Sequence, residues 1–300
     1  MINGVIVIHK EAGFTSHDVV AKMRGICGQR KIGHTGTLDP AATGVLPVCL
    51  GSATKLCDML GEKDKEYVAE LLLGVETDTQ DTTGTVLATK EVTATEEEVR
   101  SACEAFIGDY EQVPPMYSAL KVNGKKLYEL AREGKEIERK ARPVTIYELE
   151  ILEIELPVVT MRVACSKGTY IRTLCADIGA KLGCGGTMQS LKRTRVGGFR
   201  LESAVTLGQL QEKKDAGCLR ETVIPVDEMF SECPALHVTE KGALLLENGN
   251  PLEPKHTVEQ QVYEPGAWVR VYRTDGSFAG VYAYEVARRR YRPVKMFMEK

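Results

Sequence analysis

The stretch GHTGTLDPAATGVLPVCLG, residues 33–51, places a single aspartate, Asp39, in a loop rich in glycine and threonine, directly before an apolar run. Asp-Pro pairs commonly begin turns, so Asp39 can be an ordinary turn residue. A carboxylate held in a tight loop can also act as a nucleophile or a general base, and the spacing leaves both interpretations open. The apolar run predicts a buried strand, which Pro47 limits to an edge or a bend of a sheet.

The size and composition of the chain predict a soluble protein with a sizeable core. It has 300 residues, 43% hydrophobic and 27% charged, which fits one large domain or a large and a small one. No apolar run approaches the roughly 18 residues that span a bilayer, and the N-terminus has no signal-peptide features. The nine cysteines are odd in number and form no CxxC pair. They predict free thiols in a reducing, cytoplasmic location.

The charges are unevenly distributed. The net charge of −3 argues weakly against a general nucleic-acid binder. Three segments are nevertheless basic: 121–143, 192–200 and 288–300. Each one alone can be a solvated face. Together, on an acidic chain, they favour a polyanionic partner that is bound at a specific site.

The hydrophobic periodicity predicts strands and helices over residues 1–232, where we expect an α+β domain with a large mixed sheet. Thr15 or Ser16 begins a helix that ends at Gly28, and Thr95 begins a second helix, with Glu98 at capping-box spacing. Strands are predicted at 4–10, 67–73, 145–156 and 158–165, and a further helix at 169–183. After Cys233 the short alternating runs predict a small, mostly β domain at 234–300.

Several polar residues are candidates for chemistry. His34 has no second histidine at metal-ligand spacing, so no metal site is predicted, and the glycines around it lack the Lys-Ser or Lys-Thr pair of a phosphate-binding loop. Tyr67 alternates with apolar strand residues and can be a plain sheet-face tyrosine. Tyr170 and Arg172 stand where a strand passes into a helix. Arg172 can be a surface arginine or a bidentate partner of a carboxylate or phosphate.

Five segments occur in an order that resembles a known family. They are GVIVIHKEAGFTS, GHTGTLDPAATGVLPVCLGSATK, DKEYVAELLLGVETDTQDTTG, VPPMYSALKVNGKKLYELAREG, and CSKGTYIRTL followed by LGCGGTMQSLKRTRVGGF. Together they are similar to the signature segments of the TruB family of bacterial tRNA pseudouridine-55 synthases, from about Gly4 to Phe199 and more weakly through Met229. The resemblance implies a pseudouridine-synthase-like catalytic domain that flips a uridine out of the TΨC loop of tRNA and isomerises it without cofactor or metal.

The resemblance also assigns roles to residues. It makes Asp39 the catalytic aspartate and Arg172 its cationic partner. Tyr67 would stack on the target base and move a proton. The remaining matches are Tyr170 in the same pocket, Leu191 as an apolar pocket residue, His34 against the flipped nucleotides and Lys10 at the pocket rim. The family's first motif usually has proline after its lysine, whereas Glu11 follows Lys10 here.

The resemblance extends to the partner and the assembly. The excursion at 112–143 would be a thumb-like segment that grips the T-stem, and residues 234–300 would form a PUA-like RNA-binding domain. The chain is expected to act as a monomer on tRNA, with no protein partner and no membrane.

Three alternatives stay open. A non-catalytic tRNA-binding or folding chaperone would use the same surface. An RNA-guided relative would lack the excursion. A glycoside hydrolase would need two carboxylates at one site, whereas Asp78 and Asp81 lie in a turn separate from Asp39 in the sequence.

Overall fold

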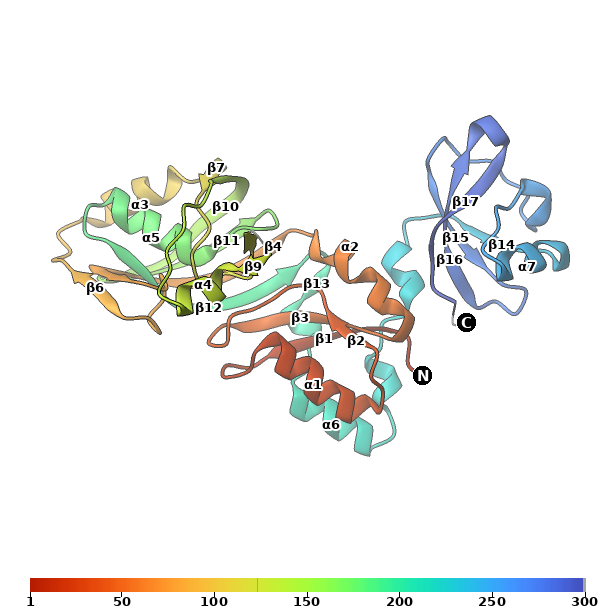
Figure 1. The fold of residues 1–300 in the computed structure, drawn as a ribbon, viewed down its shortest axis with the longest axis horizontal. Coiled ribbons are helices and arrows are strands. Elements are labelled where there is room, and N and C mark those ends of the chain that lie inside the picture. Colours follow the sequence, from red (N-terminus) through yellow and green to blue (C-terminus); the bar gives the residue numbers. More distant parts are fainter. Residues whose placement is uncertain (123, 299–300) are drawn as a thin grey trace.

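A nine-stranded mixed sheet runs through the larger part of the molecule (Figure 1). This computed structural model describes residues 1–122 and 124–298. The strand order is β1-β3-β12-β4-β11-β10-β7, with β2 beside β3 and β13 beside β12. Neighbouring strands are antiparallel, except that β3 and β12 are parallel. The strands are β1 Gly4–Lys10, β2 Ile32–His34, β3 Thr43–Leu50, β4 Lys65–Leu73, β7 Gly108–Gln112, β10 Arg142–Glu155, β11 Val158–Cys165, β12 Gly186–Val196 and β13 Phe199–Arg200.

Helices cover the sheet in two groups, each over its own apolar cluster. The helices α1 Ser16–Cys27 and α6 Leu207–Asp215 pack on the end formed by β1, β2 and β3. The helices α3 Glu96–Glu104 and α5 Ile171–Lys181 pack on the half formed by β4, β10 and β12. The shorter elements are η1 Gly51–Leu56, α2 Cys57–Gly61, the pair β5 Val75–Thr77 and β6 Val86–Thr89, and the turns η2 Leu201–Ser203, η3 Leu219–Thr222 and η4 Val226–Phe230.

Most predicted elements are confirmed, and their ends have local causes. Thr15 caps α1 in a capping box with Asp18, and Gly28 ends that helix in the left-handed conformation, at φ 64°. Thr95 and Glu98 form the predicted capping box, at the start of α3. The predicted strand at 67–73 is β4, which begins two residues earlier, at Lys65.

The edge position predicted from Pro47 is wrong, because β3 is an interior strand of the sheet. It pairs with β1 along its whole length on one side. On its other side, β12 pairs at Thr43 and Gly44, and β2 pairs from Val48 to Leu50. Pro47 lies between these two stretches, where its carbonyl accepts from the Thr35 amide at 3.2 Å. The missing N–H therefore falls where one partner strand gives way to the next.

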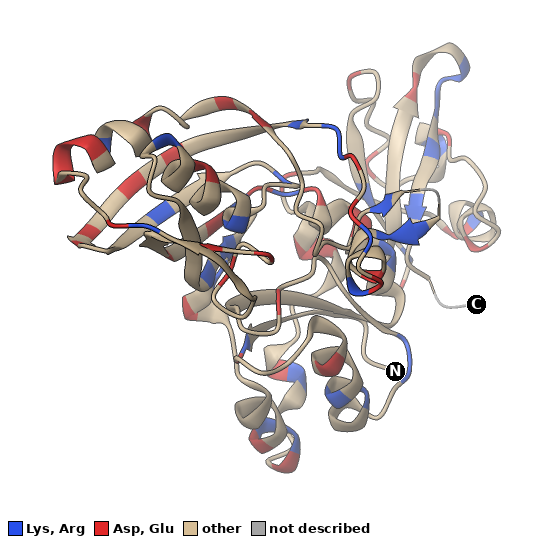
Figure 2. Cartoon of the chain, turned by 60° about the vertical axis from the view of Figure 1, so that its left-hand side comes forward, with Lys and Arg blue, Asp and Glu red and all other residues tan. Residues whose placement is uncertain are grey.

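The predicted excursion leaves the sheet between β7 and β10. It contains β8 Lys121–Val122, β9 Lys125–Lys126 and α4 Leu127–Arg132. Residue 123 of this segment lies outside the described residues. The hairpin β8–β9 carries lysines, which appear as blue arrows in Figure 2. At the base of the excursion, Gln112 on β7 forms two hydrogen bonds with the backbone of Tyr170, at 2.7 and 3.0 Å.

The C-terminal part is a small β domain, as predicted. Its sheet has the order β14-β15-β16-β17, with a turn at Thr274-Asp275-Gly276 between the second and third strands. Its elements are β14 Ala235–His237, α7 Glu240–Glu247, η5 Pro254–His256, β15 Trp268–Tyr272, β16 Phe278–Glu285, η6 Val286–Arg288 and β17 Arg290–Met296.

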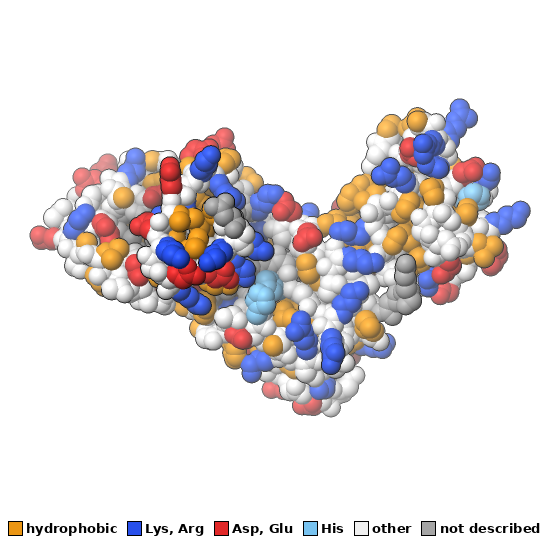
Figure 3. Space-filling model, viewed as in Figure 1, with side chains coloured by type: hydrophobic (Ala, Val, Ile, Leu, Met, Phe, Trp, Pro, Cys, Tyr) orange, Lys and Arg blue, Asp and Glu red, His pale blue; other side chains and the backbone are white. Residues whose placement is uncertain are grey.

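This domain shares an apolar cluster with the part of the chain that holds the nine-stranded sheet. Val281 and Phe297 pack with Val5, Leu56 and Leu60 of the N-terminal part. Two lysines cross the junction, since the Lys55 ammonium donates to the Met296 carbonyl and the Lys295 ammonium to the Lys55 carbonyl, both at 2.6 Å. In Figure 3, Lys and Arg side chains border the concave outline between the two parts.

The basic segment 192–200 does not form one surface patch. Lys192 and Arg200 are exposed. Arg193 is buried among backbone carbonyls, and Arg195 lies 3.9 Å from Glu66. The nine cysteines are free thiols, as predicted, and five of them are buried. In the described residues, none of the helices combines the length and the hydrophobicity needed to cross a membrane.

Candidate active site

The loop between β2 and β3 presents Asp39 at a partly open position. Ser16, at the start of α1, holds the loop by accepting from the Leu38 amide at 2.9 Å. The Asp39 carbonyl accepts from the Ala42 amide at 3.1 Å, so the Asp-Pro pair does form a turn. The carboxylate itself is not used in that turn and is 38% exposed. The turn interpretation and the catalytic interpretation of Asp39 are therefore compatible.

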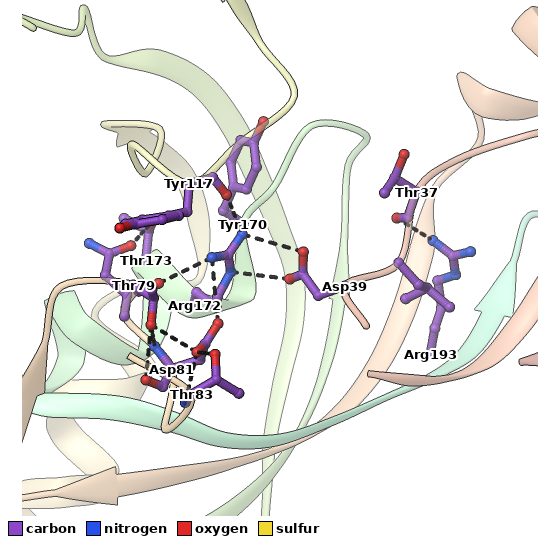
Figure 4. A network of polar contacts seen from close by, with 12 residues as sticks. Thr37, Asp39, Thr79, Asp81, Thr83, Tyr117, Tyr170, Arg172, Thr173 and Arg193 are labelled. Atoms are coloured by element: carbon purple, nitrogen blue, oxygen red, sulfur yellow. Dashed lines mark hydrogen bonds and ion pairs between the residues drawn. The ribbon is translucent and has the colours of Figure 1, made fainter. Parts of the chain in front are cut away.

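Arg172 is the cation that pairs with Asp39. It lies in the first turn of α5, after the Ser166–Tyr170 junction, and its side chain is only 7% exposed. Its Nε lies 3.1 Å from Asp39 Oδ2, and Nη2 donates to Asp39 Oδ1 at 3.5 Å and to the Tyr117 carbonyl at 2.8 Å. All three guanidinium nitrogens have partners, since Nη1 donates to the Thr79 carbonyl at 3.1 Å (Figure 4). The arginine predicted from the sequence is thus placed beside the aspartate.

Asp81 joins the same network, which sequence analysis did not foresee. Its Oδ2 lies 3.5 Å from Arg172 Nη1, so the turn that looked separate in sequence lies against the site. Its other oxygen accepts from Thr79 Oγ1 at 2.8 Å and from the Thr83 amide at 3.0 Å. Asp81 also forms an isolated bridge with Met188 of β12, which brings the turn to the sheet. Arg172 thus stands between two carboxylates (Figure 4).

The aromatic and apolar candidates line the same half of the sheet. Tyr67 on β4 is buried, and burial raises the pKa of its phenol to about 12. It is therefore protonated at neutral pH and can donate a hydrogen bond but cannot act as a base. Leu191 on β12 stands opposite Ala69 and packs against the same cluster as Tyr67. Tyr170 precedes Arg172 as the cap residue of α5, and burial raises the pKa of its phenol.

His34 lies at the edge of a hollow beside the Asp39 loop. The hollow has a volume of about 450 Å³ and is lined by His34, Thr35, Gly36, Thr37, Cys57, Asp58, Gly61 and Glu62. His34 packs edge-on against His17, with 5.2 Å between the ring centroids, and its Nδ1 is buried without a hydrogen-bond partner in the described structure. Burial, His17 and Arg193 lower its pKa. The imidazole is therefore neutral at physiological pH and has an unused polar atom.

Lys10 does not lie at a pocket rim, where the resemblance placed it. It is fully buried beneath the loop. Its ammonium donates to the carbonyls of Ala42 at 2.6 Å, Glu11 at 3.0 Å and Pro40 at 3.1 Å. Burial lowers its pKa to about 8. The side chain fixes the backbone that follows Asp39 instead of facing the opening.

The charges around Asp39 act on it in opposite directions. Burial raises the pKa of Asp39, and the neighbouring Asp81 raises it further. Arg172 and Lys10 lower it. The two cations offset the desolvation of this carboxylate only in part, so the pKa of Asp39 stays above its ordinary value. We find no carboxylate other than Asp81 against this pair in the described chain.

Two protein-family models match consecutive segments of the chain. The family model "TruB family pseudouridylate synthase (N terminal domain)" matches residues 24–171, and "tRNA pseudouridylate synthase B C-terminal domain" matches residues 172–231. A protein named tRNA pseudouridine synthase B from Lachnoclostridium phytofermentans is 50% identical, over 99% of this chain and its own full length. One of the same name from Clostridium novyi is 46% identical, over 93% of this chain and 95% of its own.

Solved structures share the fold. A chain in a Cbf5-Nop10-Gar1 complex superposes with a TM-score of 0.72 at 28% identity and covers 98% of this chain and 85% of its own. A chain in an H/ACA RNP bound to a substrate RNA containing 2'-deoxyuridine gives 0.71 at 26% identity, over 99% and 85%. With two family models in sequence, near full-length relatives and a matching fold, the chain belongs to the TruB family of pseudouridylate synthases.

Proposed function

We propose that this chain is a tRNA pseudouridine synthase that isomerises uridine-55 in the TΨC loop to pseudouridine. The observation that carries the proposal is the ion pair between Arg172 and a partly open Asp39. The names of the curated relatives support tRNA as the substrate. Asp39, Arg172, Tyr67, Tyr170, Leu191 and His34 would form the site, while Lys10 would support it from below.

The reaction requires a group that attacks or deprotonates at one face of the nucleotide. The bond between N1 and C1′ breaks, the uracil turns, and a bond between C5 and C1′ forms while C5 loses its hydrogen as a proton and N1 takes up a proton. An ionised Asp39 could attack C1′ or C6, or remove a proton from the sugar. Arg172 keeps it ionised and oriented. No step needs a redox partner, because the uracil is isomerised without change of formula.

The base has to leave the RNA stack before it can reach Asp39. Unstacking costs on the order of a few kcal/mol, which aromatic stacking and phosphate contacts must offset. Tyr67, which is buried on β4, would stack on the base, and the buried ring nitrogen of His34 beside the hollow would be available to the nucleotides. The lysines of β8–β9 would hold the T-stem backbone, and residues 234–300 would extend the contact as a PUA-like domain.

The proposal also predicts the cellular location, the catalytic domain and the oligomeric state. We place the protein in the cytoplasm, where tRNA is found and where nine free thiols stay reduced. Residues 1–232 would be the catalytic domain. A monomer suffices, since one chain carries every group named above, and light scattering with and without tRNA would test this.

The decisive experiment is release of tritium from tRNA transcript labelled with [5-³H]uridine. Wild type is expected to release about one tritium per tRNA, at the T-loop uridine only, because the new C5 bond expels that hydrogen. Asp39→Asn should bind tRNA and release none. Asp215→Asn, at the exposed end of α6, is the matched control and should release the full amount.

The same assay separates the alternatives. Binding without release by wild type would overturn the synthase proposal and favour the tRNA-binding chaperone. Release only after a guide RNA is added would favour an RNA-guided enzyme. The observation against a guided enzyme is the excursion between β7 and β10, together with relatives of 46–50% identity that are named as tRNA enzymes.

A further inference from the structure

Arg193 is one of the largest fully buried side chains in the molecule, yet no role follows for it from the site described above. It lies on β12, is 2% exposed, and its backbone pairs with Gly44 of β3. A buried guanidinium is costly unless its N–H groups are hydrogen-bonded. No carboxylate of the described chain forms an ion pair with Arg193. Its hydrogen bonds must therefore account for its burial.

The partners of Arg193 are backbone carbonyls around the Asp39 loop. Nε donates to the Val45 carbonyl at 2.7 Å, on the strand that follows the loop. Nη1 donates to the Thr37 carbonyl at 3.4 Å and Nη2 to the Gly36 carbonyl at 3.5 Å, just before Asp39. Arg193 also stands directly opposite Tyr67 of β4 in the sheet register, so the residue that binds the loop lies beside the strand that carries Tyr67.

Arg193 and Lys10 hold opposite flanks of the same loop. Arg193 fixes carbonyls before Asp39, and Lys10 fixes the carbonyls of Pro40 and Ala42 after it. Arg172 acts differently, because it pairs with the Asp39 carboxylate itself. In Figure 4, Arg193 and Arg172 lie on opposite sides of the segment that carries Asp39.

The backbone of Arg193 is held in place by close contact with Gly44 of β3. A Cβ built on Gly44 would lie 2.1 Å from the Arg193 carbonyl oxygen, so β3 and β12 touch backbone to backbone there. Gly44 has φ 108°, a conformation that glycine adopts readily and other residues do not. The guanidinium therefore projects from a fixed point toward the loop.

We propose that Arg193 is a positioning residue, which sets the Asp39 loop relative to the strand that carries Tyr67. This inference rests on the proposed function, since it concerns the same site. Arg193 would not touch the RNA. Its planar donors match carbonyls that lie in different directions, which the point charge of a lysine cannot do at once. A shift of about 1 Å in a reacting group can lower a rate by about hundredfold.

The test compares two arginines on one strand. Arg193→Lys keeps the charge and loses the spread of donors, while Arg193→Gln keeps planar donors and loses the charge. Arg195→Lys is the matched control, because Arg195 is two residues along β12 and faces Glu66. The measurements are the single-turnover rate at saturating tRNA, the Kd for tRNA and the melting curve by circular dichroism.

We expect Arg193→Lys to fold, to bind tRNA within about threefold of wild type and to lose about hundredfold in single-turnover rate. The control should stay within about twofold. A loss confined to Kd, or a rate loss equal to that of Arg195→Lys, would overturn the proposal. So would a failure of both Arg193 variants to fold, because the residue would then serve the core and not the loop.

Hydrogen exchange separates this inference from the proposed function. The amides of Thr35, Leu38 and Ala42 are hydrogen-bonded in the loop. In Arg193→Lys they should exchange faster than in wild type, while amides of α5 stay unchanged, whether or not the protein modifies tRNA. Unchanged exchange in the loop would refute the positioning role even in an active enzyme. Absence of tritium release from wild type would instead refute the synthase.

Discussion

The Asp39 loop and the excursion between β7 and β10 use the same residue types in opposite ways. Around the loop, Lys10 and Arg193 are buried and donate to backbone carbonyls. In the excursion, Lys125 and Lys135 are 59% and 62% exposed and pair with the exposed Glu133. Removing a buried donor leaves its acceptors unpaired, whereas an exposed ion pair contributes only about 0–1 kcal/mol. One region has a fixed shape, whereas the exposed ion pairs of the other cost little to break.

The comparison is tested most strongly at Arg172. Arg172→Lys cannot reach Asp39, Asp81 and two carbonyls at the same time, so we expect the single-turnover rate to fall by about 10² to 10³. Arg162→Lys is the matched control, because Arg162 is exposed on β11 and pairs with Glu150 at the surface. If Arg172→Lys lowers the single-turnover rate by less than about tenfold, the buried hydrogen bonds of Arg172 are not needed for the reaction.

The acid side of the pH profile isolates Asp81. Asp81→Asn removes a like charge, so the pKa of Asp39 should fall. The acid limb of the single-turnover rate would then move to lower pH. The rate at neutral pH should fall about tenfold, because Arg172 loses its second carboxylate. Asp78→Asn is the control, since Asp78 in the same turn accepts from the Thr85 amide and lies outside the Arg172 network. If the acid limb of the Asp81→Asn profile stays in place or moves to higher pH, Asp81 does not raise the pKa of Asp39.

The alkaline side concerns Lys10. Its folded pKa of about 8 lies below its usual 10.5, so above pH 8 the unfolded chain holds the proton that the folded chain has released. Stability from this group therefore rises with pH between 8 and 10.5. Activity should fall over the same range, because a neutral amine has two donors for three carbonyls.

The two trends can be measured together. Urea unfolding and single-turnover rates should be measured at pH 7.5 and 9.5. In wild type, the free energy of unfolding should rise and the rate should fall between these two pH values. Lys10→Met has no group that titrates at this position and should not show the rise in the free energy of unfolding. Parallel changes in both quantities would show that Lys10 does not titrate beneath the loop.

The smallest effect is expected in the excursion. Lys125→Ala should leave the melting curve and the saturated rate unchanged and should weaken tRNA binding uniformly. Because one fewer phosphate is neutralised, the slope of log Kd against log salt should decrease by about 1. Lys181→Ala, at the far end of α5, should leave that slope as in wild type. A change in the saturated rate of Lys125→Ala would contradict the claim that the excursion affects only tRNA binding.

Local signals in the sequence predicted most of the secondary structure. The caps at Thr15 and Thr95 and the alternation in β4 and β11 depend on neighbours a few residues apart, and these predictions are confirmed. The five motifs identified the family, and the structure brings Asp39 and Arg172 together. The burial of Lys10 and Arg193 could not be predicted, because the local sequence does not show whether a lysine or an arginine is buried or exposed in the fold.

Long-range pairing explains the other omissions. Arg193 binds a carbonyl 148 positions earlier in the chain, and Asp81 reaches the site only because its turn bridges to Met188. Pro47 was misplaced for a related reason, since its strand changes partner from β12 to β2 at that residue. Spacing along one segment carries no information about which distant strand will lie beside it.

The shared apolar cluster at the domain junction bears on how this protein can be divided. Val5, Leu56 and Leu60 belong to the larger part, yet they are covered by Val281 and Phe297 of the smaller one. A shortened chain ending at residue 232 would expose this cluster to water and gain a surface prone to self-association. Reduced activity in such a fragment would therefore reveal little about RNA binding, and point substitutions on the outer face of β14–β17 are the better way to dissect the C-terminal domain.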